Sequence, residues 1–187
     1  MNETQRHTLD FETVFVTHKK RVYNTVLALL QNREETEDVV QDIFVKIYET
    51  LPQFKGESSV STWIHRIAVN KTLDFLRARK TKKRSGFIVS LFGDKKEEAT
   101  AFDLPDFMHP GVIAENKELA VTLFKAINQL AENQKVAFTL SKIDGLNYAE
   151  IAEVMQVSTP SVESLLFRAK QNLQKLLRDF YENEVLM

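Results

Sequence analysis

Apolar side chains recur every three or four positions along most of this 187-residue chain, a spacing that predicts amphipathic helices. No window alternates apolar and polar residues for long enough to predict a strand, so the expected fold class is all-α. Three helices are predicted between residues 10 and 84, and Pro52 ends the second of them. Their expected inward positions are Phe11, Val14, Phe15, Val22, Val26, Leu29 and Leu30, then Val39, Val40, Ile43, Phe44 and Ile47, then Trp63, Ile64, Ile67, Ala68, Leu73 and Leu76.

A second group of helices is predicted from residue 119 onward, and it contains a helix-turn-helix at 147–170. Asn147 followed by Glu150 predicts a capping box at the start of its first helix. Thr159 before Pro160 predicts the N-cap and first residue of its second helix. Small and apolar residues fall where two helices must cross at a short turn. Since such a pair reads the DNA major groove, the motif predicts DNA binding.

Residues 86–118 differ in composition from both helical regions. They hold three of the five glycines and two of the four prolines, and they are acidic. We therefore expect two small helical domains, residues 1–85 and 119–187, joined by a flexible linker and behaving as independent modules. The apolar run at 87–92 could either dock on another surface or complete the first core.

The distribution of charged residues along the chain is more informative about function than the net charge of −1. Residues 1–85 carry 15 basic and 11 acidic side chains, whereas residues 119–187 carry 7 and 8. The helix-turn-helix domain is therefore expected to bind DNA weakly when alone, because phosphate neutralisation supplies most non-specific affinity. The chain has no cysteine, no clustered histidines, no apolar N-terminal segment and no membrane-spanning run. These features predict a cytoplasmic protein without cofactor, metal site, signal peptide or membrane insertion.

The third predicted helix combines an aromatic ring with cations. Along it lie Trp63, Arg66, Asn70, Lys71, Asp74 and Arg77, and a basic run continues at 77–84. Bases of single-stranded DNA stack on aromatic rings while cations follow the backbone, so the combination favours nucleic acid. A core tryptophan and a solvated basic helix end are the plainer alternatives.

The second predicted helix is acidic instead. Its Asp38, Gln41 and Asp42 lie beyond the first turn, where the helix dipole no longer explains a preference for acids. An acidic face repels DNA, and we therefore interpret it as a protein-docking face.

Three motifs in this order resemble a known family. The stretch at 37–46 is similar to region 2.2 of the bacterial sigma-70 family, 62–70 to its regions 2.3 and 2.4, and 148–170 to its region 4.2. Roughly residues 10–84 and 119–180 resemble the extracytoplasmic-function (ECF) group of sigma factors. The resemblance implies a non-enzymatic subunit that binds core RNA polymerase and directs promoter-specific initiation. It also implies promoter DNA as a partner, both as duplex and as melted single strand, and an anti-sigma factor, soluble or anchored in a membrane.

The resemblance also implies roles for individual residues. Region 2 melts and reads the minus-ten promoter element, and region 4 reads the minus-thirty-five element. The residues expected on these surfaces are Asp38, Gln41, Asp42 and Phe44 for polymerase; Lys55, Glu57, Ser58, Ser59, Trp63, Arg66, Asn70, Lys71, Arg77, Arg79 and Lys80 for minus-ten DNA; and Tyr148, Ser161, Glu163, Ser164, Phe167, Arg168 and Lys170 for minus-thirty-five DNA.

Two positions depart from the family pattern. Glu163 and Leu165 stand near the start of the recognition helix, where many members carry basic residues. Glu163 could complement the helix dipole or accept a hydrogen bond from a cytosine amine. Leu165 could pack inward or touch a thymine methyl group.

Two other classes of protein compete with this interpretation. A one-component regulator would need a ligand pocket or dimer interface within residues 1–85, and it would bind duplex promoter DNA without polymerase. A nucleic-acid enzyme would need carboxylates or histidines clustered around a metal ion. The sequence offers neither feature.

Overall fold

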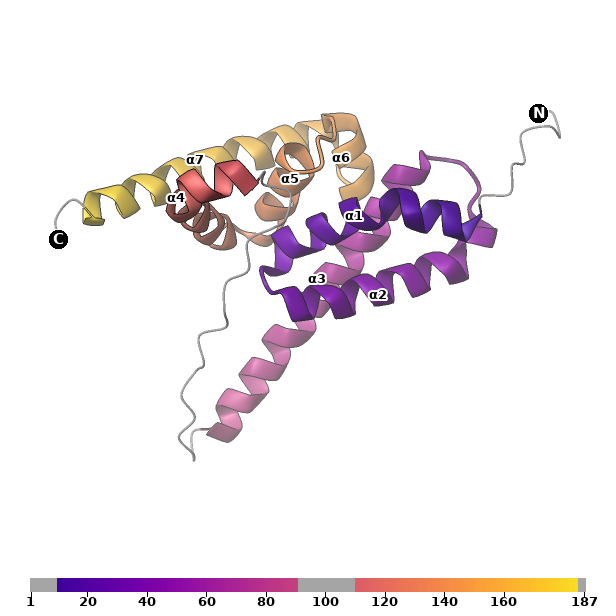
Figure 1. Cartoon of the computed structure of the whole chain (residues 1–187), viewed down its shortest axis with the longest axis horizontal. Coiled ribbons are helices and arrows are strands. Elements are labelled where there is room, and N and C mark those ends of the chain that lie inside the picture. Colours follow the sequence, from indigo (N-terminus) through magenta and orange to yellow (C-terminus); the bar gives the residue numbers. More distant parts are fainter. Residues whose placement is uncertain (1–9, 91–109, 185–187) are drawn as a thin grey trace.

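The computed structural model describes residues 10–90 and 110–184, and within these ranges it contains helices and no strands. Its side chains are described at 10–82 and 119–178. The all-α class predicted from the sequence is confirmed. Helices α1 to α3 form the N-terminal half, and α4 to α7 form the C-terminal half (Figure 1). The helices are α1 Phe11–Leu30, α2 Arg33–Thr50, α3 Val60–Ser90, α4 Pro110–Asn128, α5 Glu132–Lys142, α6 Tyr148–Met155 and α7 Thr159–Glu184.

Side chains next to the helix starts fix the first two boundaries. The carboxylate of Asp10 accepts the backbone N–H of Thr13, 3.2 Å away, at the start of α1. The amide oxygen of Asn32 accepts the N–H of Glu35 at 2.9 Å and caps α2. Between the two helices Gln31 adopts a left-handed conformation with φ of 55°, which ends α1 and lets the chain reverse.

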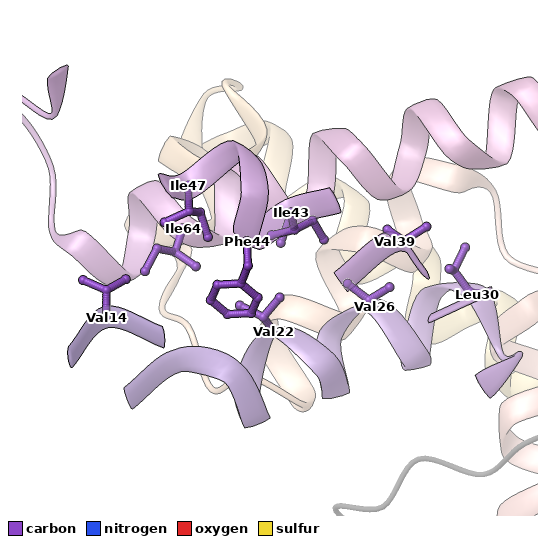
Figure 2. Close-up of a cluster of buried hydrophobic side chains, with 10 residues drawn as sticks. Val14, Val22, Val26, Leu30, Val39, Ile43, Phe44, Ile47 and Ile64 are labelled. Carbon is purple, nitrogen blue, oxygen red and sulfur yellow. The ribbon is translucent and has the colours of Figure 1, made fainter. Parts of the chain in front are cut away.

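The core of the N-terminal half is built mainly from apolar side chains. Nine of its members point toward one another from α1, α2 and α3, with the Phe44 ring directed at α1 (Figure 2). Val22, Ile43 and Ile64, one from each helix, are completely buried. The helical periodicity of the sequence predicted most of this core, but Phe15, also expected inward, is 37% exposed and lies against Phe44 at the surface.

The helix-turn-helix of the C-terminal half is formed by α6 and α7. Asn147 accepts the N–H groups of Ala149 and Glu150, and the Glu150 carboxylate accepts the N–H of Asn147, so the predicted capping box is confirmed. The prediction for Thr159 was wrong by one residue. Thr159 is the first residue of α7, and the hydroxyl of the preceding Ser158 accepts the N–H of Ser161 at 3.4 Å. Ser158 and Thr159 each carry a hydroxyl that can cap the helix, and the sequence pattern does not show which of them does so.

The two halves pack directly against each other, and α6 lies across α3 (Figure 1). Leu29, Val69 and Leu73 of the N-terminal half share one buried cluster with residues of α5, α6 and α7. A third cluster joins Ala28 of α1 to residues of α4 and α7. The expected independence of the halves was therefore wrong: apolar residues that each half leaves outside its own core are buried by the other.

The range expected as a linker, 86–118, is helical at both ends. Helix α3 runs to Ser90, and its C-terminal end extends away from the other helices (Figure 1). Helix α4 begins at Pro110. Residues 91–109 lie outside the described residues, as do the side chains of the apolar run at 87–92.

Candidate functional surfaces

The acidic face of α2 is exposed to solvent. Asp38, Gln41 and Asp42 are all exposed, each one turn or less from the next. Phe44 differs from them, since only 5% of it is exposed and its ring belongs to the core of the N-terminal half. The structure thus brings three of the four residues expected to contact polymerase together at the surface, with the fourth beneath them.

A mostly apolar groove adjoins this acidic face. It has a volume of about 520 Å³ and lies between α1 and α2. Gln41 and Phe44 line it together with Phe15, Val45 and Tyr48, which are 37%, 52% and 64% exposed. Edge-on aromatic contacts build its walls: the ring centroids are 4.8 Å apart for Phe15 and Phe44. Exposed large apolar side chains gathered in one groove are typical of a protein-binding surface. Tyr48 and Val45 were not among the predicted site residues.

The loop between α2 and α3 presents polar groups around a sharp turn. Gly56 has φ of 73°, a conformation that disfavours residues with a side chain. Lys55 and Glu57 are exposed, and Ser58 is half-buried. The hydroxyl of Ser59 accepts the N–H of Thr62 at 3.0 Å and so caps α3. Four expected minus-ten residues therefore lie in one loop, and one of them also starts the helix that follows.

Trp63 at the start of α3 is half-buried. Its ring packs against that of Phe54, with centroids 5.1 Å apart, and against the apolar core of the N-terminal half. Arg66 and Asn70 follow on the same stripe, one half-buried and the other exposed. Trp63 is therefore partly buried against the core and partly accessible to solvent.

Two arginines farther along α3 have acidic partners. Arg77 lies 3.0 Å from the Glu132 carboxylate of α5 and 3.4 Å from that of Asp74. Arg79 pairs with Glu35 of α2. Lys80 is exposed and Lys71 is half-buried.

On α7 the predicted DNA-reading residues form a solvent-exposed face. Val162 and Ala169 are completely buried and turn the opposite side of the helix inward. Leu165 is partly buried against the cluster shared by the two halves, which resolves its ambiguity in favour of packing. Tyr148 of α6 is 44% exposed. The residues that project outward from α7 are Ser161, Glu163, Ser164, Phe167, Arg168 and Lys170.

Buried polar residues between the halves escaped the sequence analysis. Lys135, His65 and Asp144 are each less than a tenth exposed. Burial lowers the pKa of Lys135 to about 8, and the charge of Arg79 adds to the effect. A polar residue within an apolar stripe was the only sequence signal available, and many solvent-exposed residues give the same signal.

The described residues contain no group of three or more histidines and carboxylates placed to hold a metal ion. Among the helices in the described ranges, none is both long and apolar enough to cross a membrane.

Comparison with known proteins identifies both halves. The model of Sigma-70 region 2 matches residues 14–82, and that of Sigma-70 region 4 matches residues 121–173. The chain is 31% identical over 172 residues to the ECF RNA polymerase sigma-E factor of Escherichia coli (strain K12), covering 90% of this chain and 88% of that one. It is 30% identical over 172 residues to the RNA polymerase sigma-H factor of Pseudomonas aeruginosa, covering 90% and 86%.

Solved structures share the fold. The sigma factor RpoE of Bartonella quintana, solved in complex with the anti-sigma factor NepR, has a TM-score of 0.68 at 22% identity, covering 90% of this chain and 97% of that one. CnrH, solved with the cytosolic domain of CnrY, has a TM-score of 0.63 at 21% identity, covering 90% and 88%. The chain belongs to the ECF group of the sigma-70 family, and it is therefore a transcription initiation factor of RNA polymerase and not an enzyme.

Proposed function

We propose that the chain carries out promoter-specific initiation through three separate surfaces, one for polymerase and two for DNA. Residues 1–85 act as region 2 and residues 119–187 as region 4. The observation that carries the proposal is the separation of charge and apolar surface in the N-terminal half. The acidic face and groove belong to α1 and α2, whereas the cationic stripe belongs to α3. One half can therefore meet a protein and DNA at the same time.

The polymerase surface consists of Asp38, Gln41 and Asp42 with the neighbouring groove. The groove supplies apolar area, which drives association, while the acidic rim sets orientation and repels DNA. Phe44 contributes from below by holding the position of the Phe15 ring.

Charge reversal on α2 tests this surface. Asp38→Lys with Asp42→Lys should reduce co-purification with core polymerase at least tenfold, because both side chains face solvent and would meet the partner with the wrong sign. Thermal unfolding should stay unchanged. Glu153→Lys on α6 is the control, since it reverses one acidic charge at an exposed position outside the surface. Co-purification equal to that of the control would disprove the assignment.

The minus-ten surface comprises the loop at 55–59 and the outward stripe of α3. Lys55, Glu57 and Ser58 surround the Gly56 turn and are placed to receive an unstacked base. Trp63 offers a half-buried ring packed against Phe54, with Arg66, Asn70 and Lys71 farther along the helix, and Arg77, Arg79 and Lys80 provide cations for the backbone. Melting costs a few kcal/mol per extruded base, so this surface works only when polymerase supplies further contacts.

The minus-thirty-five surface is the outward face of α7 with Tyr148. Residues near a recognition helix start lie closest to base edges, so Ser161, Glu163 and Ser164 read sequence while Arg168 and Lys170 hold phosphates. Transcription from a library randomised across this element separates the roles. Arg168→Ala should lower initiation on all members, and Glu163→Ala should change which bases are preferred. An unchanged preference profile for Glu163→Ala would leave Glu163 as a helix-end residue only.

The partner expected besides polymerase and promoter is an anti-sigma factor. Two proteins of similar fold, RpoE and CnrH, were solved with NepR and with the cytosolic domain of CnrY, and this supports the proposal. A chain that acts on RNA polymerase and DNA works in the cytoplasm. Expression of an anti-sigma factor that binds this chain should suppress run-off transcription directed by this chain. Transcription by the same polymerase with another sigma factor should continue.

A further inference from the structure

The arginines of the basic run on α3 are paired with carboxylates. Between residues 77 and 82 the cations are two arginines, Arg77 and Arg79, and two lysines, Lys80 and Lys82. Both arginines form ion pairs with acidic side chains, and both lysines face solvent. A guanidinium group matches the paired oxygens of a phosphate better than an ammonium group does. A carboxylate presents the same paired oxygens, and it therefore competes with DNA for the arginines.

One of these ion pairs lies entirely within the N-terminal half. The Glu35 carboxylate of α2 accepts a hydrogen bond from the Arg79 guanidinium group of α3, 44 residues away in sequence. The Glu35 side chain is 26% exposed and that of Arg79 is 38% exposed, whereas that of Arg77 is 61% exposed. Partial burial reduces the screening of an ion pair by water and salt. Glu35 therefore holds Arg79 more firmly than the exposed carboxylates hold Arg77.

The side chain of Glu35 differs in its contact from that of Glu150. Each glutamate stands three residues after the asparagine that caps its helix. The Glu150 carboxylate accepts the Asn147 N–H at 2.8 Å and closes a capping box, whereas the Glu35 carboxylate is directed to Arg79. The cap of α2 uses the backbone N–H of Glu35, which donates to Asn32 at 2.9 Å. The Glu35 side chain can therefore be changed without removing this cap.

Pairing with Glu35 changes how Arg79 acts on DNA. A carboxylate and a guanidinium group in contact have no net charge, so the pair attracts the phosphate backbone less than Arg79 alone would. To bind a phosphate, Arg79 must either leave Glu35 or bring the negative charge of the carboxylate close to that of the phosphate. Both routes cost free energy. Phosphate contacts carry no sequence information, so the cost applies to any DNA strand.

We propose that Glu35 is a phosphate mimic, which limits the affinity of the minus-ten surface for the DNA backbone by neutralising Arg79. The inference rests on the proposed function, which assigns Arg79 to minus-ten DNA. Glu35 acts through Arg79 and contacts no base. Non-promoter sites far outnumber promoters in a genome, so weaker backbone binding shortens the time that the polymerase complex spends at the wrong sites.

Removal of the Glu35 charge tests the proposal. Glu35→Gln keeps the size of the side chain and the cap of α2, and it removes the carboxylate that neutralises Arg79. In the complex with core polymerase, fluorescence anisotropy should show about two- to fivefold tighter binding to a labelled single strand that carries the minus-ten element. A strand of scrambled sequence should gain by the same factor, and both gains should shrink as salt is raised. Glu34→Gln is the matched control, because it removes the same charge from an exposed neighbour on α2 and should change binding by less.

A second substitution separates neutralisation of Arg79 from mechanical support of α3. In a chain that carries Arg79→Gln, Glu35→Gln should change DNA binding no more than Glu34→Gln does, because no guanidinium group is left to release. Binding by Glu35→Gln that equals that of Glu34→Gln, or that falls below that of the parent chain, would overturn the proposal. A parent complex that binds both strands equally would instead refute the assignment to minus-ten DNA. The comparison of Glu35 with Glu34 on either strand would still decide the role of Glu35.

Discussion

Two buried regions of this molecule differ in the chemistry of their side chains. The core between α1, α2 and α3 is lined by Val22, Ile43, Ile64 and their apolar neighbours. The contact between the halves also buries aliphatic residues, but it encloses Lys135 and Asp144 as well. Apolar burial is favourable wherever it occurs, whereas a buried charge is costly unless its partners are complete.

The difference sets a mainly apolar core apart from a contact that also buries charged and polar groups. The apolar core must persist in the free chain and on polymerase, because it positions the groove, the loop at 55–59 and the stripe of α3. A compact chain of this length has a radius of gyration of about 16 Å, whereas promoter elements centred about 25 base pairs apart are separated by roughly 85 Å of duplex. The contact between the halves buries polar groups that need matched partners, alongside apolar residues of both halves.

The largest expected effect is a cavity in the apolar core. Ile43 is fully buried among residues of the N-terminal half, so Ile43→Ala should lower the free energy of unfolding by about 2–5 kcal/mol. Chemical denaturation followed by circular dichroism measures this loss. A change well under about 1 kcal/mol would mean that the core is looser than the structure shows.

A matched cavity in the contact between the halves should act differently. Leu29 is 1% exposed, but its buried neighbours include residues of the C-terminal half. Leu29→Ala should lower the stability of the contact between the halves by up to about 2–5 kcal/mol. The loss is limited because the halves can separate. Small-angle scattering should show a larger radius of gyration, with the unfolding of the N-terminal half little changed. Unfolding like that of Ile43→Ala, without expansion, would place Leu29 in a permanent core.

The pH dependence of the contact should have a defined sign. Lys135 has a pKa of about 8 when buried and of 10.5 in its ordinary state, so the open chain binds more protons above pH 8. The packed arrangement is therefore penalised below pH 8 and strengthened as pH rises, by about 1 kcal/mol between pH 7 and pH 9. Small-angle scattering between pH 7 and pH 9 checks the effect. Arg79, whose charge also lowers the pKa of Lys135, is kept in place. Lys135→Met should remove the dependence, and a dependence that survives in this variant would assign it to another group.

The smallest expected effect concerns the exposed ion pair between the halves. Arg77 and Glu132 are 61% and 43% exposed, and such pairs contribute roughly 0–1 kcal/mol. Glu132→Gln should weaken the contact slightly at low salt and leave it unchanged at high salt. A large expansion caused by this variant would mean that the exposed pair, and not the buried residues, holds the halves together.

The local structure was predictable because its causes are local. The capping box of Asn147 and Glu150, the cap at Asn32 and the inward stripes of α1 to α3 all follow from residues within a few positions of one another. The outward face of α7 followed from the same periodicity. The position of Trp63 was harder to predict. Whether its ring packs inward or stays exposed depends on Phe54, which lies in the loop before α3.

The contact between the halves was not predictable by the same means. Lys135 meets Leu29 across 106 residues, and Asp144 meets Thr25 across 119. Leu29 was correctly expected to face inward, but periodicity does not say whether it faces its own core or that of the other half. A single lysine or aspartate in an amphipathic helix gives no signal of its distant partner.

The most direct test of the account is the distance between the two halves in the free chain and at a promoter. Lys20→Cys with Lys175→Cys puts fluorescent labels on exposed positions of α1 and α7 in a chain without other cysteines. Energy transfer should be efficient in the free chain and should fall sharply in the complex with core polymerase and promoter DNA, where the elements lie roughly 85 Å apart. Equal transfer in an actively initiating complex would contradict the claim that the halves must separate to work.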